Sequence, residues 1–355
     1  MVFVEIAKRL LKDYDFTLVT SYLGSQLCID NNLKINFLLT TKEQSFSSVI
    51  FIYIKRIIKG IEMSFKVKKP DLILSTSDIL PDVIPSLFLK IKFRKVCWVQ
   101  HIFHINPSTR YVSHFSQRLS FFLIKRFADI IVVDNSLLKK ELVRIGFNKN
   151  KINVNYPGIN LEYLGKVESA KKTYTGVFMA QLRKSKGIID LIRIWKRVCN
   201  RLPNAKLAII GKGSEDIIVE LKEEIKKLDL EKNITILGFL PTEAAFSTIK
   251  ASKIFVFPSH EEGFGIAPLE AQALGVPVVA YNLPVFEEVF PTGMIKVEKH
   301  DINKFAKRIV GVIENQDYKV ILSKEALENA QRFDWDKTAS TEHEIFNNVL
   351  NNGLM

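Results

Sequence analysis

The residues best suited to chemistry lie in one short stretch, residues 259–270, which reads SHEEGFGIAPLE. It follows an apolar run typical of a buried strand, and Gly263 and Gly265 let the backbone turn sharply and approach a ligand closely. Pro268 is predicted at the first position of a helix, with Ala267 as an N-cap that has no capping side chain. The free N–H groups at that helix end would attract a phosphate.

Two glutamates belong to the same stretch. Glu262 is expected in the loop and Glu270 in the first helical turn, with seven residues between them. A first-turn glutamate can serve as the partner in a capping box, but such a box needs Ser or Thr at the N-cap, and Ala267 is neither. The sequence therefore predicts that Glu270 faces a ligand.

The elements that must position this stretch alternate between short apolar runs and amphipathic helical patterns. In the second half, strands are predicted at residues 175–180, 205–210, 233–238, 253–258 and 276–280. In the first half, they are predicted at residues 16–21, 72–75, 96–99 and 130–133. Apolar strands separated by amphipathic helices indicate parallel sheets covered on both faces. We expect an α/β protein with two Rossmann-like doubly wound domains that face each other across a cleft.

A turn-rich joint at residues 155–160 separates the expected domains. We predict an N-terminal domain over residues 1–157 and a C-terminal ligand-binding domain over residues 158–320. Helices over residues 321–355 are expected to pack back towards the N-terminal domain. A doubly wound domain normally opens with a strand and a Gly-rich turn, whereas this sequence starts at Val2 inside a helical pattern. We therefore expect the first strand of the N-terminal domain to be missing.

With these elements in place, the stretch from Thr175 to Val289 resembles the C-terminal domain of the family-4 retaining glycosyltransferases (glycosyltransferase group 1), which have the GT-B fold. The resemblance is carried by Glu262 and Glu270 with Gly-Phe-Gly between them, and by the trailing GVPVVA run at residues 275–280. It implies that Glu270 accepts hydrogen bonds from the ribose hydroxyls of a nucleotide sugar. It also implies that Glu262 is catalytic and holds the donor sugar.

A second matching segment, residues 178–187, reads FMAQLRKSKG. Similar enzymes have Gly-Arg-Leu followed three residues later by Lys-Gly, and the Arg and Lys clamp the diphosphate. Lys186 matches the Lys and would neutralise charge on the leaving nucleotide. The Arg position is occupied by Gln181, which can donate a hydrogen bond but carries no charge. Either Arg183 reaches in from two residues along, or the leaving group is less well stabilised.

The resemblance implies further contacts to the donor. Three backbone amides are implied to hold sugar and phosphate oxygens: those of Gly263, Phe264 and Gly265. The loops at Gly213 and Leu240 are implied to line the pocket for the base. In the first half, His101 ends a predicted strand where similar enzymes often have a catalytic histidine near the donor sugar. A structural histidine at a strand end is the alternative reading of His101.

The charge of the chain points to a partner of its first half. The formal net charge is +13, and residues 1–150 hold 23 Lys and Arg against 12 Asp and Glu. Basic residues are interleaved with Phe, Ile, Leu and Tyr in residues 51–69 and 107–126, which makes an anionic membrane surface the better candidate partner than nucleic acid. A plain solvated face of a lysine-rich protein is the alternative reading. No zinc finger or RNA-recognition motif accompanies the charge, so no nucleic acid partner is expected.

These observations predict retaining transfer of a sugar from a nucleotide-diphosphate sugar to a lipid-linked or polysaccharide-precursor acceptor at the membrane. No metal or other cofactor is expected, because the sequence has no Asp-x-Asp loop and no His/Cys cluster. Three scattered cysteines suit the cytoplasm, with the protein on the inner face of the membrane. The alternatives are a catalytically impaired nucleotide-sugar-binding homologue or partner subunit, and a sugar-nucleotide epimerase with the GT-B fold.

Overall fold

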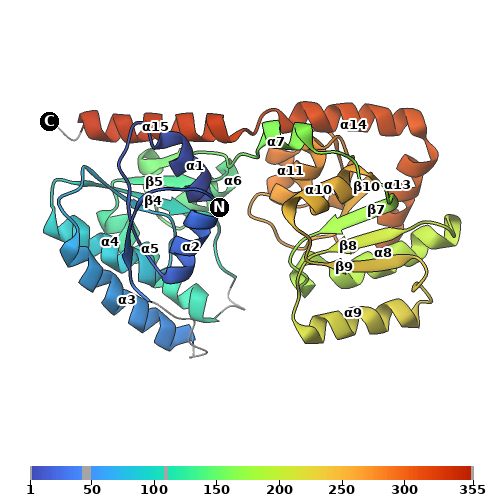
Figure 1. Ribbon diagram of the computed structural model, residues 1–355, viewed down its shortest axis with the longest axis horizontal. Coiled ribbons are helices and arrows are strands. Elements are labelled where there is room, and N and C mark those ends of the chain that lie inside the picture. The colour runs from blue at the N-terminus through green and yellow to red at the C-terminus, as the bar shows by residue number, and fades with distance from the viewer. Residues whose placement is uncertain (1, 42–48, 108–110, 353–355) are drawn as a thin grey trace. The chain divides into compact units, whose positions relative to one another are not determined.

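The computed structural model describes residues 2–41, 49–107 and 111–352 (Figure 1). The chain divides into two compact units, which are described separately. The first unit comprises residues 1–158 together with residues 335–355, and the second comprises residues 159–334. The last helix of the chain therefore belongs to the first unit, although it follows the whole of the second unit in the sequence.

The second unit alternates strands and helices from β7 to β12. Its elements are α7 (Leu161–Lys166), β7 (Tyr174–Met179), η2 (Lys184–Lys186), α8 (Ile188–Arg201), β8 (Leu207–Ile210), α9 (Glu215–Lys227), β9 (Ile234–Gly238), α10 (Thr242–Lys250), β10 (Ser252–Phe257), α11 (Ile266–Ala273), β11 (Val278–Tyr281), α12 (Pro284–Val289), β12 (Met294–Val297), α13 (Ile302–Glu314) and α14 (Gln316–Ala330). Strands β8 and β11 are buried along their whole length, as expected for a sheet that helices cover on both faces.

The six strands of the second unit form one parallel sheet. Their order is β12-β11-β10-β7-β8-β9, so the chain starts in the middle, builds one side through β8 and β9, and then crosses back to build the other side. This is the order of a doubly wound Rossmann-like sheet. The packing of α8 on it depends on Gly176 in β7, because a Cβ there would lie 2.7 Å from the Trp195 ring.

The first unit has the same alternation of elements. Its elements are α1 (Val2–Leu10), β1 (Thr17–Thr20), α2 (Tyr22–Asp30), β2 (Asn36–Leu39), α3 (Val49–Lys66), β3 (Leu72–Ser75), α4 (Leu80–Lys92), β4 (Cys97–Ile102), α5 (Tyr111–Phe127), β5 (Ile130–Val133), α6 (Ser136–Arg144), η1 (Lys149–Lys151), β6 (Ile152–Val154) and α15 (Trp335–Asn352). Asn135 is the N-cap of α6, and its side chain accepts a hydrogen bond from the Leu138 amide.

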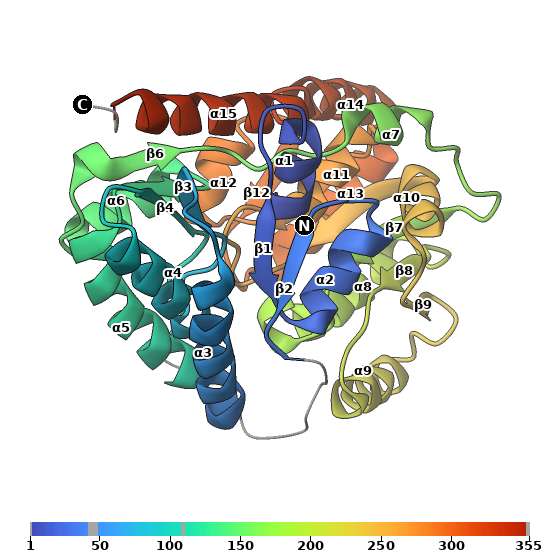
Figure 2. The same ribbon diagram turned by 60° about the vertical axis from the view of Figure 1, so that its left-hand side comes forward.

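The parallel strands of the first unit fall into two sheets. One has the order β3-β4-β5-β6, and the other consists of β1 and β2. Figure 2 shows β1 and β2 standing apart from β3. The main core lies on the four-stranded sheet around Trp98 and Ile131, and α15 closes the opposite face through Phe346. Within the described residues, no helix is both long enough and apolar enough to cross a membrane.

Candidate functional site

The candidate site lies at the carboxyl edge of the sheet of the second unit. Strands β7 and β10 are neighbours there, and the chain leaves them in opposite directions across the sheet, towards β8 and β11 respectively. Such a switch point leaves a crevice between the two following loops, and it is where ligands bind in open α/β sheets. The loop after β7 carries the motif at residues 180–187, and the loop after β10 carries the motif at residues 258–265.

The two loops are tied together by their backbones. The amide of His260 donates to the carbonyl oxygen of Ser185 at 2.9 Å. Gly187 has a φ of +68°, and a Cβ on it would lie 1.7 Å from the carbonyl oxygen of Pro258. Only glycine fits this position without displacing the other loop. The sequence motifs therefore meet because a left-handed glycine lets their backbones touch.

The tied loops bring Lys186 and Glu262 into contact. Nζ of Lys186 lies 2.6 Å from Oε1 of Glu262, and the two side chains are 13% and 10% exposed. A charge-assisted hydrogen bond with this little exposure is stronger than one on the open surface. The sequence placed both residues at a donor site, but it gave no indication that they pair with each other.

The structure corrects the expected start of helix α11. The helix begins at Ile266, with Gly265 as its N-cap, rather than at Pro268 with Ala267 as its N-cap. Gly265 has a φ of +102°, and a Cβ on it would lie 2.9 Å from the ring of Phe286, so the turn is made at the glycine. No side chain caps the helix, as expected, but Glu270 consequently lies in the second turn rather than the first.

Glu270 is the most perturbed acid of this region. Burial raises the pKa of its carboxyl to about 8, although part of the residue keeps contact with solvent. Within the described part of the chain, no hydrogen bond or ion pair compensates this burial. An enclosed carboxyl that protein groups leave unpaired is suited to accept hydrogen bonds from a ligand.

The loop after β7 holds further polar atoms without a protein partner. Nε of Arg183 and Oγ of Ser185 are both buried and make no hydrogen bond. Gln181, at the position where similar enzymes have Arg, is exposed. Buried donors that lack an acceptor are costly and mark places where a ligand or water binds. Ser185 was not singled out from the sequence, since a serine in a basic loop carries no distinctive pattern.

The loops after β8 and β9 border the same edge of the sheet. The amide of Leu182 donates to the carbonyl oxygen of Lys212 at 2.7 Å, which ties the loop after β7 to the loop that contains Gly213. Nζ of Lys212 lies 4.6 Å from the centre of the Phe239 ring, and Phe239 is 66% exposed. Leu240, next to that ring, is half-buried. These contacts place the two predicted base-pocket positions in neighbouring loops.

His101 belongs to the first unit, unlike the other candidate residues. It lies at the end of β4 and is buried, and its Nε2 lies 2.7 Å from Oε1 of Glu342 on α15. The other oxygen of Glu342, a residue that is fully buried, accepts a hydrogen bond from Nδ2 of Asn155 at 2.8 Å. The sequence could not reveal this partner, because Glu342 follows His101 by 241 residues.

One group of described side chains has the composition of a metal site. Ligand atoms of Asp190, His260 and His300 lie within 4.8 Å of one another. The hydroxyl of Tyr281 donates to Oδ2 of Asp190 at 2.9 Å, and the His260 ring stacks on the Tyr281 ring. Burial is the largest influence on the pKa of His260 and lowers it. The carboxylate of Asp190 thus already has a hydrogen-bond donor from the protein.

Comparison with known proteins finds a family match in the second unit. The family model of the glycosyl transferases group 1 matches residues 161–332. An uncharacterized glycosyltransferase of Methanocaldococcus jannaschii is 32% identical over 235 residues, which cover 60% of this chain and 55% of that protein. A D-inositol 3-phosphate glycosyltransferase of Corynebacterium jeikeium is 27% identical over 178 residues, which cover 48% and 42%. The chain spans about half the length of these curated relatives.

Solved structures show the same fold. Anabaena HepE, in complex with UDP and glucose, superposes with a TM-score of 0.80 at 19% identity, covering 98% of this chain and 95% of that one. Sucrose-phosphate synthase of Thermosynechococcus elongatus gives 0.74 at 17% identity, covering 90% and 84%. The two units thus have the Rossmann-like folds of the GT-B architecture. The match to the glycosyl transferases group 1 covers nearly the whole of the second unit.

Proposed function

We propose that the protein transfers a sugar from a nucleotide-diphosphate sugar to an acceptor, with retention at the anomeric carbon. The observation that carries the proposal is the ion pair of Lys186 with Glu262 at the switch point. The turn that contains Glu262 leads into the helix that carries the unpaired carboxyl of Glu270. The family match and the relatives named as glycosyltransferases support this reaction class.

The diphosphate would bind in the loop after β7. Lys186 supplies a cation, and Nε of Arg183 and Oγ of Ser185 are buried donors that await an acceptor. Phosphate oxygens would satisfy both donors and remove the cost of leaving them unpaired. Charge that develops on the leaving nucleotide would be stabilised by the same groups. Because Nε of Arg183 is buried in the loop whereas Gln181 is exposed, we favour Arg183 as the replacement for the family's arginine.

The rest of the donor would follow the edge of the sheet. The ribose hydroxyls would donate to Glu270, and the base would lie near Gly213 and Leu240. The sugar would contact Glu262 and the backbone amides of the turn at residues 263–265. UDP-glucose is the first donor to test, because the neighbour HepE was solved with UDP-glucose. We also propose a catalytic role for His101 of the first unit. Glu342 would fix the orientation of its ring.

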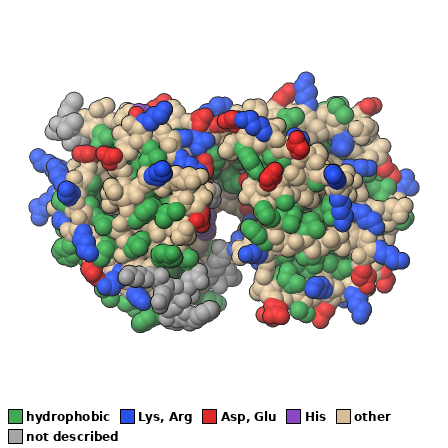
Figure 3. Space-filling view, viewed as in Figure 1, with side chains coloured by type: hydrophobic (Ala, Val, Ile, Leu, Met, Phe, Trp, Pro, Cys, Tyr) green, Lys and Arg blue, Asp and Glu red, His purple; other side chains and the backbone are tan. Residues whose placement is uncertain are grey.

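The acceptor would lie at a membrane surface, which the first unit contacts through α3 and α5. On α5, Tyr111, Phe115 and Phe122 are 82%, 71% and 70% exposed. On α3, the exposed hydrophobic residues are Ile50, Phe51, Ile54, Ile58 and Phe65. Figure 3 shows hydrophobic and basic side chains side by side on the visible face of this unit. Exposed aromatic residues mixed with Lys and Arg favour an anionic lipid surface.

The membrane proposal is tested by sedimentation with vesicles of phosphatidylcholine, with and without phosphatidylserine. We expect binding that needs the anionic lipid, weakens in salt, and falls several-fold in Phe115→Asp. Phe239→Asp, which changes an exposed aromatic residue of the other unit, is the matched control and should bind vesicles as the unchanged protein does. Equal binding by both variants, or binding independent of phosphatidylserine, would contradict this part of the proposal.

The reaction is tested with UDP-glucose, GDP-mannose and ADP-glucose as donors and membrane lipid extract as acceptor. Formation of an α-linked product from an α-linked donor, followed by NMR of the anomeric proton, would support retaining transfer. Binding of a donor without any product would favour the alternative, a nucleotide-sugar-binding homologue or partner subunit, for which the uncharged Gln181 is the motivating observation. Release of free nucleotide with an altered sugar would indicate an epimerase.

A further inference from the structure

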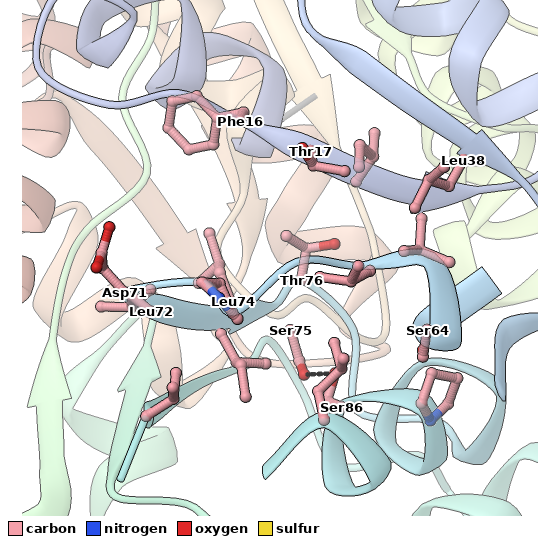
Figure 4. Close-up of a pocket in the computed structure, with 18 of the residues that line it drawn as sticks. Phe16, Thr17, Leu38, Ser64, Asp71, Leu72, Leu74, Ser75, Thr76 and Ser86 are labelled. Atoms are coloured by element: carbon pink, nitrogen blue, oxygen red, sulfur yellow. Dashed lines mark hydrogen bonds between the residues drawn. The ribbon is translucent and has the colours of Figure 1, made fainter. Parts of the chain in front are cut away.

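Two features of the structure have no role in the proposed function. The first is a cavity of ≈ 1420 Å³ between β1 and β3 in the first unit (Figure 4). The hydroxyl of Ser75 donates to that of Ser86 at 2.6 Å, so these two polar groups of the cavity already satisfy each other. Among the described residues, no three metal-ligating side chains gather in this cavity. The second feature, in the second unit, does have the arrangement of a ligand set.

The second feature consists of Asp190, His260 and His300, which we call the His-Asp cluster. Asp190 lies in the first turn of α8, His260 in the loop after β10, and His300 in the turn between β12 and α13. Strands β12, β11, β10 and β7 are consecutive neighbours in the sheet, so the segments that follow them meet at one edge. The sequence predicted no metal, because the members of the cluster are far apart along the chain and show no ligand spacing.

The distances within the cluster are too long for hydrogen bonds but suit the ligands of one metal ion. Oδ2 of Asp190 lies 3.5 Å from Nε2 of His260 and 3.5 Å from Nδ1 of His300. N–H···O hydrogen bonds are about 2.7–3.2 Å long, whereas two atoms bound at about 2.1 Å to a tetrahedral zinc ion lie about 3.4 Å apart. The two imidazole nitrogens lie within 4.8 Å of each other. The His300 side chain, which is 68% exposed, is the ligand that can close the remaining distance.

Tyr281 supplies the outer contact that a metal-binding carboxylate needs. Its hydroxyl donates to Oδ2 of Asp190 at 2.9 Å, and the residue is fully buried at the end of β11. A carboxylate oxygen can accept such a hydrogen bond and still offer a lone pair to a metal. The Tyr281 ring also stacks on that of His260, with ring centres 5.6 Å apart. One buried side chain therefore positions two of the three ligands.

The segments that carry the ligands are held together by the protein itself. The amide of His260 donates to the carbonyl oxygen of Ser185 at 2.9 Å, which ties the loop after β10 to the turn that leads into α8. Nζ of Lys299 donates to the carbonyl oxygen of His260 at 3.0 Å, which ties the same loop to the turn after β12. A metal would therefore bind to a site whose backbone is already in place, at little cost in ordering.

We propose that the His-Asp cluster binds one divalent transition-metal ion, and that zinc fits it best. Two imidazole nitrogens and a carboxylate oxygen are typical ligands of zinc, whereas Mg²⁺ and Ca²⁺ require mainly oxygen ligands. The fourth ligand is water, which reaches the site beside the exposed His300. The ion ties α8, the loop after β10 and the turn after β12 together. Its role is structural, so the proposal does not depend on the sugar transfer proposed above.

Two features of the cluster limit the expected affinity. Nδ1 of His260 is buried and has no hydrogen-bond partner among the described residues, so this ligand lacks the outer acceptor that strengthens metal binding. The ammonium group of Lys299 places a positive charge beside the same residue, which disfavours a second cation. We therefore expect a dissociation constant for zinc on the order of micromolar, weaker than that of a closed structural zinc site.

Zinc binding is measured by competition with a chromogenic chelator, on protein without a polyhistidine tag and without nucleotide. We expect one zinc ion per chain, bound at least about tenfold more weakly by His300→Asn. Asn suits the backbone at this position, where φ is +69°, so the variant removes the imidazole without straining the turn. His104→Asn, which removes an exposed imidazole of the first unit, is the matched control and should bind zinc as the unchanged protein does.

Stability provides a second measurement. Zinc at about 100 times its dissociation constant should raise the melting temperature of the unchanged protein and of His104→Asn by about 5 °C or more. At the same zinc concentration, the rise in His300→Asn should be about half as large or smaller. Tyr281→Phe, which removes only the hydroxyl that positions Asp190, should bind zinc about tenfold more weakly.

Cobalt reports the geometry of the site. Co²⁺ absorbs strongly in the visible range when it is four-coordinate and only weakly when it is six-coordinate, so we expect strong bands that are lost in His300→Asn. A weak six-coordinate spectrum would overturn the proposal. Equal zinc affinity in His300→Asn and the unchanged protein would also overturn it, as would the absence of zinc binding. In either of these two cases, the His-Asp cluster is an ion-paired group of side chains without a metal.

Discussion

The raised pKa of Glu270 makes donor binding depend on pH. In the free protein, burial holds the pKa of this carboxyl at about 8, so the neutral form predominates at pH 7. If ribose hydroxyls donate to the carboxylate, the bound state requires the ionised form, and binding must release a proton. The affinity for a nucleotide sugar should therefore rise with pH up to about pH 8 and then level off.

The size of the effect follows from the ionised fraction. With a pKa of about 8, roughly 1% of the carboxyl is ionised at pH 6 and half at pH 8, so the dissociation constant should fall by about 50-fold across that range. At pH 7, about 0.9 proton should be released per molecule bound. UDP-glucose is the right probe, because it lacks the terminal phosphate monoester whose second pKa near 6 would add its own titration.

Calorimetry in buffers of different ionisation enthalpy measures both quantities. Glu270→Gln keeps the shape of the side chain but cannot ionise, so its weaker binding should be flat in pH and release no proton. Glu223→Gln, at an exposed position on α9, is the matched control and should behave like the unchanged protein. A flat affinity between pH 6 and pH 8 in the unchanged protein would refute the reasoning, as would a pH-dependent affinity that persists in Glu270→Gln.

Three further predictions concern the same site. In the free protein, Glu270→Gln should melt increasingly above the unchanged protein as pH rises from about 4.5 to 8, since a raised carboxyl pKa means that folding favours the neutral form. Gly187→Ala should lose at least about 2 kcal/mol of stability in denaturant titration. Gly165→Ala is the control, and it should lose no stability from a steric clash because no atom lies within 4 Å of its Cβ position. Lys186→Met should lower the free energy of unfolding by about 2 kcal/mol, because it leaves the Glu262 carboxylate unpaired. Adding Glu262→Gln should recover most of this loss. If the effects of the two substitutions simply add in the double variant, the ion pair is contradicted.

Much of the fold could be predicted from the sequence, chiefly the strands that form clear apolar runs. Residues 72–75 and 130–133 were predicted as strands and are β3 and β5 with the same bounds. The short strands β2, β6 and β12 were missed, because three or four residues at half-buried edges show no periodicity. The start of α11 was predicted two residues late, since the preference of Pro for the first helical position was outweighed by the backbone of Gly265.

The candidate site could be predicted as a set of residues but not as a set of contacts. The motifs predicted that Lys186 and Glu262 both contact a donor, yet their mutual pairing depends on a sheet order that brings together residues 76 positions apart. The orphaned Nε of Arg183 and the shifted pKa of Glu270 arise from burial, which residue types do not encode. Glu342 was missed for the same reason, since it reaches His101 only after the whole second unit.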